Sequence, residues 1–383
     1  MRIKLLSYLV AVSAFTLVGC DSKSAEEYIA AAKVQYQKND TQAAIIDLKN
    51  AIALDPKNKE ARANLGKYYL GAGSFVESEK ELRRAIELGE AKESVYPDLV
   101  KAIYYQNDFD RLILLTKDFS SSDPQVQSSV ALFSFLAALK QTNSETDLSN
   151  DFSLMLGDDK ILAQVYYEFS QGNLEEADQL LTRFQNPQQN HIEKLIVTGL
   201  LKAQLKQYSP AISALERVVN LSPEYYVIQF QLADILINAQ EYAKARTLTD
   251  QLVKINARSA YANLLMAKIE LHDENYKKAF DAAEIAVQNG IDSTQSNLLA
   301  GVSAYKIERT ESAYKYLSKA SKGLPHDHMA NRLLVDVKIR LGETENLAEM
   351  LEGISGQDAQ KSSLLESAAM LKFREGDLEG SKS

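Results

Sequence analysis

The chain has 383 residues, of which 43 are Lys or Arg and 52 are Asp or Glu, so its formal net charge is −9. With 45% hydrophobic residues it can bury a sizeable core, which excludes an intrinsically disordered chain. The acidic balance argues against nucleic acid or anionic lipid as the partner. Its single cysteine, Cys20, excludes any disulfide within the chain.

Residues 1–19 are predicted to be a signal peptide. Arg2 and Lys4 make a short basic start, and residues 5–17 are an apolar run broken only by two serines and a threonine. A helix that spans a bilayer needs about 20 apolar residues, so this run is too short for a span and is typical of a secretory signal.

The stretch Leu17-Val18-Gly19-Cys20 resembles a bacterial lipobox. The resemblance implies cleavage before Cys20 and lipidation of its thiol, with fatty acids such as palmitate anchoring the chain on the periplasmic side of a membrane. The alternative is a buried cysteine in an ordinary signal peptide. Asp21 stands directly after Cys20 and resembles a retention signal, which favours the inner membrane of the envelope over the outer one.

The body of the chain repeats with a period of 34 residues, counted from Ala25 and again from Ile192. A small residue recurs at the eighth place of the period, Ala at the twentieth and an aromatic ring at the seventeenth. These are the signature places of a tetratricopeptide repeat, in which two antiparallel helices approach closely. The expected fold class is therefore all-α, a solenoid of helix pairs wound as a right-handed superhelix. Examples of the three places are Gly66, Gly199, Ala233, Ala267 and Gly301; Ala44, Ala211, Ala245, Ala279 and Ala313; and Phe75, Phe109, Tyr208, Tyr242 and Tyr276.

Three segments follow the signal peptide. Residues 20–122 are predicted as the first repeats, 123–157 as a degenerate repeat and flexible break, and 158–383 as further repeats with an incomplete last unit. Within the break we expect a helix from Pro124, a polar loop, and a helical remnant at Phe152 to Leu156. In the last segment Ser209 and Pro210 are expected to be a helix N-cap and its first-turn proline.

The end of the chain is expected to be a truncation point. A first helix opens near Ser362, and only six residues follow the turn at Glu375 to Asp377, too few for a partner helix. We expect Lys361 to Ser383 to be the least protected part of the array.

Catalytic patterns are missing from the sequence: it has no GxSxG, no HExxH and no glycine-rich phosphate loop. We therefore expect no enzyme activity and no cofactor. His326 and His328 have a spacing that a metal site can use, but they follow Pro325 in a predicted turn. We interpret them as solvated turn residues and expect no metal site.

The expected binding surface is a concave groove lined by the first helix of each repeat, through its second, fifth, ninth and twelfth places. Aromatic rings beside charges suit peptides and sugars equally, and the alternative is that these rings pack between repeats. The base-and-asparagine clamp of chaperone-binding repeats is not reproduced, since Ile29 and Lys33 stand at its places. The groove candidates are Lys101, Tyr104, Tyr261, Lys268, Tyr305 and Arg332, with Val302 and Asp336 at equivalent places.

The segment from Cys20 to Phe109, with AIIDLKNAIALDP and ELRRAIELG after the lipobox, resembles the tetratricopeptide lipoproteins of the PEP-CTERM (exosortase) system. The resemblance implies an envelope scaffold encoded with exopolysaccharide production and surface-protein sorting, without enzyme activity. Its expected partners are proteins or peptides, the membrane through the lipid, and polysaccharide as a further candidate. Two alternatives stay open: a lipoprotein for pilus or outer-membrane protein assembly, and the recognition arm of an enzyme that continues beyond Ser383.

Overall fold

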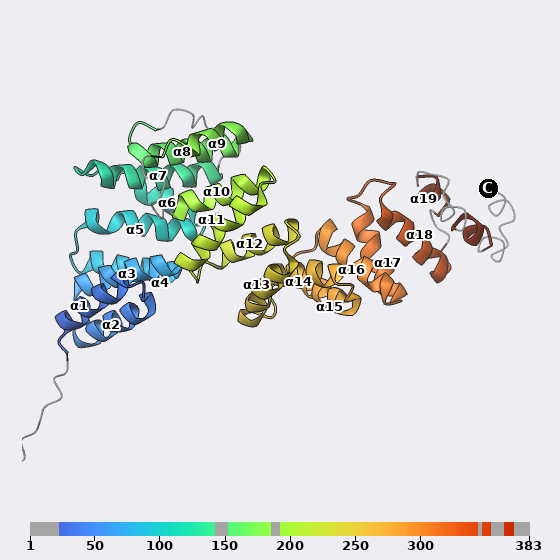
Figure 1. The fold of residues 1–383 in the computed structure, drawn as a ribbon, viewed down its shortest axis with the longest axis horizontal. Helices are drawn as coiled ribbons and strands as arrows, with labels where there is room; N and C mark the ends of the chain where they lie inside the picture. Colours follow the sequence, from blue (N-terminus) through green and yellow to red (C-terminus); the bar gives the residue numbers. More distant parts are fainter. Residues whose placement is uncertain (1–22, 142–151, 185–191, 344–346, 354–363, 371–383) are drawn as a thin grey trace, which may run out of the picture. The chain divides into compact units, whose positions relative to one another are not determined.

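A computed structural model describes residues 23–141, 152–184, 192–343, 347–353 and 364–370 (Figure 1). These residues form helices, turns and irregular segments, and no strand occurs among them. The chain divides into two compact units, Met1–Asn143 and Ser144–Ser383, which we call the N-terminal and C-terminal arrays. The fold is a tetratricopeptide-repeat solenoid, which confirms the predicted fold class. The predicted signal peptide, including Cys20 and Asp21, lies outside the described residues.

The N-terminal array is a series of helix pairs in which each helix packs against the next. α7 begins at the predicted Pro124 and contacts both α5 and α6, so it takes the place of a first helix in the following repeat. The helices of this array are α1 (Ala25–Gln37), α2 (Thr41–Leu54), α3 (Lys59–Ala72), α4 (Phe75–Glu87), α5 (Lys92–Tyr105), α6 (Phe109–Thr116) and α7 (Pro124–Gln141).

The C-terminal array continues the same pairing from α8 to α19. Helices α10, α12, α14 and α16 begin at Ile192, Tyr226, Ala260 and Thr294, the starts that the 34-residue period predicts. The helices are α8 (Gly157–Ser170), α9 (Leu174–Leu181), α10 (Ile192–Gln204), α11 (Tyr208–Leu221), α12 (Tyr226–Asn238), α13 (Tyr242–Ile255), α14 (Ala260–His272), α15 (Tyr276–Gln288), α16 (Thr294–Lys306), α17 (Thr310–Ser321), α18 (Met329–Leu341) and α19 (Leu347–Gly353).

Two local expectations are wrong. Residues 152–156 form a turn, in which Met155 N–H donates to Phe152 O at 3.2 Å, and no helix forms there. α11 begins one residue before Ser209, with Gln207 as its N-cap, so Ser209 and Pro210 lie inside its first turn. A proline is tolerated there because the first turn of a helix has no internal acceptor for its N–H groups.

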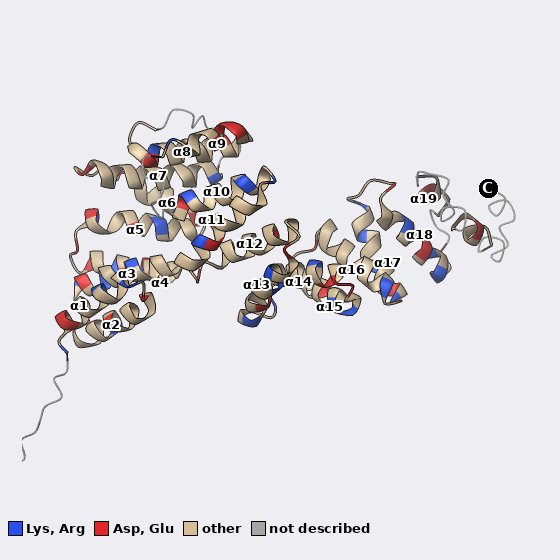
Figure 2. Ribbon diagram, in the orientation of Figure 1, with Lys and Arg blue, Asp and Glu red and all other residues tan. Residues whose placement is uncertain are grey.

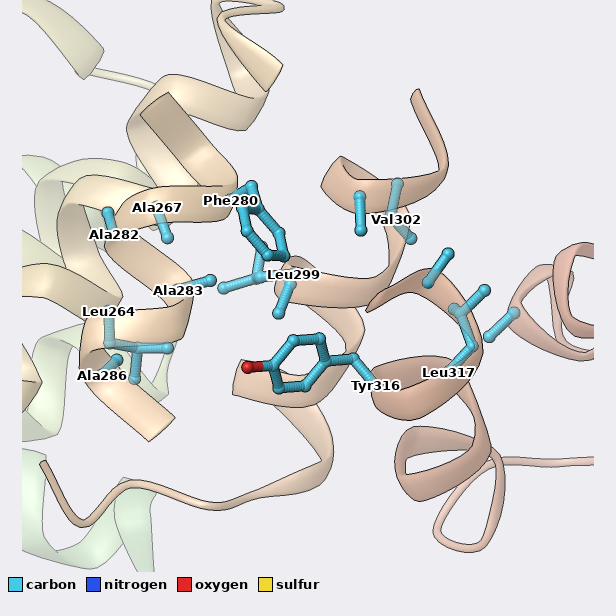
Figure 3. Close-up of a cluster of buried hydrophobic side chains, with 14 of the residues drawn as sticks. Leu264, Ala267, Phe280, Ala282, Ala283, Ala286, Leu299, Val302, Tyr316 and Leu317 are labelled. Atoms are coloured by element: carbon cyan, nitrogen blue, oxygen red, sulfur yellow. The ribbon is translucent and has the colours of Figure 1, made fainter. Parts of the chain in front are cut away.

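The core of the C-terminal array is built where consecutive pairs meet. Figure 3 shows Phe280 of α15 and Tyr316 of α17 on either side of Leu299 from α16, and all three side chains are buried. The two rings lie 6.1 Å apart at 68°, an edge-to-face arrangement. The Tyr316 hydroxyl donates to Glu284 Oε1 at 2.9 Å, and burial together with this bond raises the pKa of Tyr316 to about 12. The core thus extends from one repeat into the next.

The eighth place is glycine in three repeats, at Gly66, Gly199 and Gly301, where a leucine of the second helix occupies the space beside it. A Cβ added to Gly301 would lie 2.8 Å from Leu317 Cγ and 3.0 Å from the Leu317 backbone nitrogen. Real Cβ atoms essentially never lie closer than 3.0 Å to another non-bonded heavy atom, and Leu317 is fully buried. The helices α16 and α17 therefore cross at a distance that only a glycine permits at this place.

The residue at the fifteenth place of the repeat has a left-handed backbone conformation, with positive φ, and this conformation ends the first helix. Gly73, Gly172 and Gly342 occupy it in three repeats, but in six others the residue is not glycine. In the repeat of α12 and α13, Gln240 has φ 62°, and the next N–H, of Glu241, donates to Leu236 O at 2.8 Å to close the helix end. A side chain in this conformation costs about 1–2 kcal/mol.

We predict that Gln240→Gly stabilises the C-terminal array. Relief of the left-handed strain, about 1–2 kcal/mol, exceeds the added chain entropy of glycine, about 0.5–1 kcal/mol. Gln251→Gly, the same replacement at an exposed place inside α13, is the matched control and should destabilise by about 0.5–1 kcal/mol. Urea unfolding followed by circular dichroism measures both, and a lower midpoint for both variants would contradict the prediction.

Candidate functional site

The predicted groove residues lie on the first helices of the repeats, which contact one another in succession. In the C-terminal array α12 contacts α14, α14 contacts α16, and α16 contacts α18. We call the surface formed by the second, fifth, ninth and twelfth places of these helices the A-helix face. Figure 2 shows acidic and basic residues interspersed along the helices of both arrays. The charge that this face presents to a ligand therefore depends on how its individual acidic and basic side chains are paired.

Between α12 and α14 the A-helix face carries one aromatic contact and one ion pair. The Tyr261 ring meets Phe230 edge-on at 5.4 Å and remains 38% exposed. Next to it, Lys268 Nζ lies 2.6 Å from Asp234 Oδ1, with both side chains half-buried. Burial and the charge of Asp234 raise the pKa of the Tyr261 phenol. Tyr261 is thus the predicted groove ring that offers free surface, whereas Lys268 is already paired.

Between α16 and α18 the face is closed by a polar cluster. Tyr305 Oη donates to Asp336 Oδ2 at 2.7 Å, and Arg340 lies 2.7 Å from the same carboxylate. The Arg340 guanidinium also sits over the Tyr305 ring, 5.0 Å from its centroid. Burial raises the pKa of Tyr305, and the bond to Asp336 raises it further. Arg340 belongs to this cluster although its place in the repeat did not predict it.

The other predicted places of the C-terminal array are more enclosed. Val302 is only 8% exposed and belongs to the core cluster, so its assignment to the groove surface is wrong. Arg332 lies half-buried on α18. Exposed apolar surface is found instead at second places, where Val227 is 47% exposed and Met329 is 53% exposed.

In the N-terminal array Tyr104 and Lys101 pack against the following repeat. The Tyr104 ring lies 5.4 Å from Phe133 of α7 and 5.6 Å from Phe109. Lys101 Nζ lies 5.7 Å from the centroid of the same Phe133 ring. The contacts of Tyr104 and Lys101 are therefore those of the alternative in which these side chains pack between repeats.

The A-helix face of the N-terminal array also holds a cavity of about 240 Å³, which the sequence did not single out. It lies between α3 and α5 and is floored by Leu82 and Val95, both buried. Glu60 and Ser94 of its rim stand at the second place of their repeats, and Asn64 and Asp98 at the sixth, but these places give no sign of the apolar floor beneath them. The remaining lining residues are Glu60, Ala63, Asn64, Lys67, Glu90, Ser94 and Asp98.

Of the two candidate histidines, His328 has a structural role. His328 is the N-cap of α18, and its Nδ1 accepts the N–H of Ala330 at 3.1 Å. Across the described ranges, no group of three His, Cys, Asp or Glu side chains is placed to hold a metal ion. None of the helices in those ranges is both long and apolar enough to cross a membrane.

Comparison with known proteins agrees with the repeat geometry. The tetratricopeptide repeat family model matches residues 35–93 and 202–269, one segment in each array. The chain thus contains tetratricopeptide repeats, arranged as a solenoid of that class. No curated protein sequence matches the chain.

Several solved structures are similar in part. MamA (41 to the end) from Desulfovibrio magneticus RS-1 is 20% identical, over 42% of this chain and 92% of that chain, with a TM-score of 0.38. YrrB, described as a TPR protein with an unusual peptide-binding site, is 19% identical over 45% of this chain and 88% of that chain, with a TM-score of 0.39. Yeast Tom70 is 12% identical over 92% of this chain and 96% of that chain, with a TM-score of 0.37.

The contacts of Tyr104 and Tyr261 predict different costs of truncation. Tyr104→Ala removes a ring from the cluster with Phe109 and Phe133 and should lower the free energy of unfolding by about 2–3 kcal/mol. Tyr261→Ala removes a ring that is 38% exposed and should cost about 1 kcal/mol. Chemical denaturation of the two single variants measures the difference. Equal losses would show that both rings are packing residues.

Proposed function

We propose that the chain is a non-catalytic scaffold that binds a segment of another protein on the A-helix face of its C-terminal array. Tetratricopeptide-repeat proteins generally act as scaffolds suited to protein–protein interaction. The observation that carries the proposal is Tyr261, whose ring rests on Phe230 and still exposes 38% of its surface. Rings held in this way give a large contact area at little cost in side-chain entropy, which is typical of residues that dominate protein interfaces.

The surroundings of Tyr261 favour a protein segment. Exposed apolar side chains at second places, Val227 and Met329, can contact apolar side chains of a ligand. Polar pairs at ninth and twelfth places, such as Lys268 with Asp234, can exchange hydrogen bonds with its backbone. A polysaccharide would use the ring but not the apolar second places, so it is the alternative outcome of the test below.

We further propose that a lipid on Cys20 tethers this scaffold to the periplasmic side of the inner membrane of a bacterial envelope. The support is the lipobox-like sequence at Leu17 to Cys20 and the aspartate at Asp21. Two or more acyl chains are needed for stable anchoring, and lipidation of this kind supplies them. The resemblance of Cys20 to Phe109 to PEP-CTERM system lipoproteins supports an assembly linked to exopolysaccharide production and protein sorting.

The groove proposal predicts where a partner can be crosslinked. A photoreactive phenylalanine analogue at Val227, on the A-helix face, should yield adducts in membranes of the native host, whereas the same analogue at Thr247, exposed on α13, should not. Tyr261→Ala should reduce the Val227 adducts about tenfold, as expected for loss of a dominant interface ring. Tyr276→Ala, a tyrosine at the seventeenth place, is the matched control. Adducts that resist protease and yield to glycosidases would refute a protein ligand.

The anchor proposal predicts the behaviour of two variants. Cys20→Ser should abolish incorporation of radiolabelled palmitate and leave an uncleaved precursor, because a serine hydroxyl is a far weaker nucleophile than a thiolate. Asp21→Ser should keep the label but move the protein from the inner to the outer membrane in a sucrose gradient. Labelling of the Cys20→Ser variant at the parental level would refute lipidation at this residue.

A further inference from the structure

We infer that the cavity between α3 and α5 binds the side chain of an arginine or lysine that belongs to the protein partner. The inference deepens the proposed function and rests on it, because it assigns a chemistry to the protein partner that the scaffold binds. At about 240 Å³ the cavity is smaller than the 300–1,000 Å³ typical of small-molecule sites. It therefore suits one long side chain.

The rim of the cavity is acidic on balance. Glu60, Glu90 and Asp98 contribute three carboxylates, and Lys67 contributes one ammonium group. Asn64 and Ser94 add neutral hydrogen-bonding groups between them. Lys33 and Lys59 lie outside the lining but pair with Glu60 and Glu90. The negative charge of the rim is therefore available to a cationic group that displaces either lysine, and it repels an anionic group.

The floor of the cavity is apolar and suits the stem of such a side chain. Leu82 and Val95 are each 1% exposed and form part of the packed interior. Arginine and lysine bury their methylene stems on apolar surface while their charged ends remain at the polar rim. A compact inorganic cation gains nothing from this floor, and the described carboxylates do not form a group that could hold a metal ion. The combination therefore favours an organic cation with an aliphatic stem.

Two of the rim carboxylates pair with exposed lysines, and Glu90 also accepts a hydrogen bond from Ser94 Oγ at 3.3 Å. Lys33 Nζ lies 2.7 Å from Glu60, and the two side chains are 50% and 57% exposed. Lys59 Nζ lies 3.9 Å from Glu90 and is 51% exposed. Exposed ion pairs of this kind contribute little free energy, so an incoming guanidinium or ammonium can replace either lysine at small cost.

Glu79, on α4 of the same repeat, is an example of a carboxylate with a structural role in this array. It is 6% exposed, and Arg111 donates to both of its oxygens, at 2.7 and 3.0 Å. Gln106 adds a further bond at 2.8 Å. Glu60 and Glu90 have no comparable enclosure, which is why we assign them to binding.

The test uses the full chain and two probes of the same shape, N-acetylarginine methylamide and its uncharged citrulline analogue, with binding followed by ligand-observed NMR. The arginine probe should bind, and the citrulline probe should bind about tenfold more weakly, because charge-assisted hydrogen bonds are about twice as strong as neutral ones. The double variant Glu60→Gln/Glu90→Gln should weaken the arginine probe about tenfold. Lys67→Gln should instead strengthen it about threefold, since it removes the one like charge on the rim.

The matched control is Glu77→Gln/Glu87→Gln, which removes the same charge from exposed places on α4 outside the cavity and should leave binding unchanged. Equal binding of the two probes, an equal loss in the control, or no effect of the Glu60 and Glu90 changes would overturn the inference. Tighter binding of spermidine than of the arginine probe would also overturn it, in favour of a free polyamine. Protein adducts at Val227 without arginine binding would refute this inference alone, whereas arginine binding without such adducts would refute the proposed function.

Discussion

The close crossing of the two helices in each repeat is the constraint on which the rest of the structure depends. At Gly66, Gly199 and Gly301 there is no room for a Cβ, because a leucine sixteen residues later fills the space. In the repeat of α14 and α15 the equivalent residues are Ala267 and Ala283, and both are fully buried. Val165 and Val335 stand at the same place as Ala267 in two further repeats and are also fully buried, so the residue at the crossing varies with its local packing. This crossing fixes how each pair presents its outer surfaces, and so it fixes the A-helix face.

Contacts between repeats are far more varied in chemistry. The twenty-first place of one repeat meets the eleventh place of the next, as Lys202 with Asp178 at 2.7 Å and as Arg246 with Glu270 at 2.6 Å. Later in the array the same junction is Lys338 over the Tyr314 ring, 5.8 Å from its centroid. Each junction therefore uses a different pair of side chains at the same two places of the repeat.

The buried member of such a pair is stable only with its partners. Burial alone would raise the pKa of Glu270, but hydrogen bonds from Arg246 and Asn275 outweigh it and hold that pKa below its ordinary value. Removal of one partner would leave a buried charge uncompensated, which costs more than the pair contributes. At the junction of α13 and α14, buried charge is thus held by partners in its own and in the neighbouring repeat.

The sequence predicted the repeat frame well because small residues and turns obey strict steric rules. It predicted the starts of α10, α12, α14 and α16, and the start of α7 at Pro124. It could not separate groove residues from packing residues, because a place on a helix face does not say what the next helix covers. Tyr104 is covered by Phe133 of α7, whereas Tyr261 keeps an open side.

The cavity escaped sequence analysis for a related physical reason. Glu60 and Glu90 are ordinary helix-surface and turn residues in the sequence, and nothing in their spacing shows that an apolar floor lies beneath them. That floor comes from Leu82, which the crossing with Gly66 pulls close to α3. A functional feature that arises from the distance between two helices is invisible until that distance is known.

The two arrays differ in how exposed the ion pairs are that a ligand would meet. On the C-terminal array the Lys268–Asp234 pair beside Tyr261 is enclosed, with its side chains 16% and 30% exposed, so a ligand there gains mainly from apolar contact with the ring. On the N-terminal array the carboxylates of the cavity have exposed and easily displaced partners. Apolar contact supplies affinity with little discrimination, whereas a poorly satisfied charge discriminates between ligands through attraction and repulsion. We therefore expect the C-terminal array to contribute affinity for its ligands through apolar contact, and the cavity of the N-terminal array to discriminate between side chains by their charge.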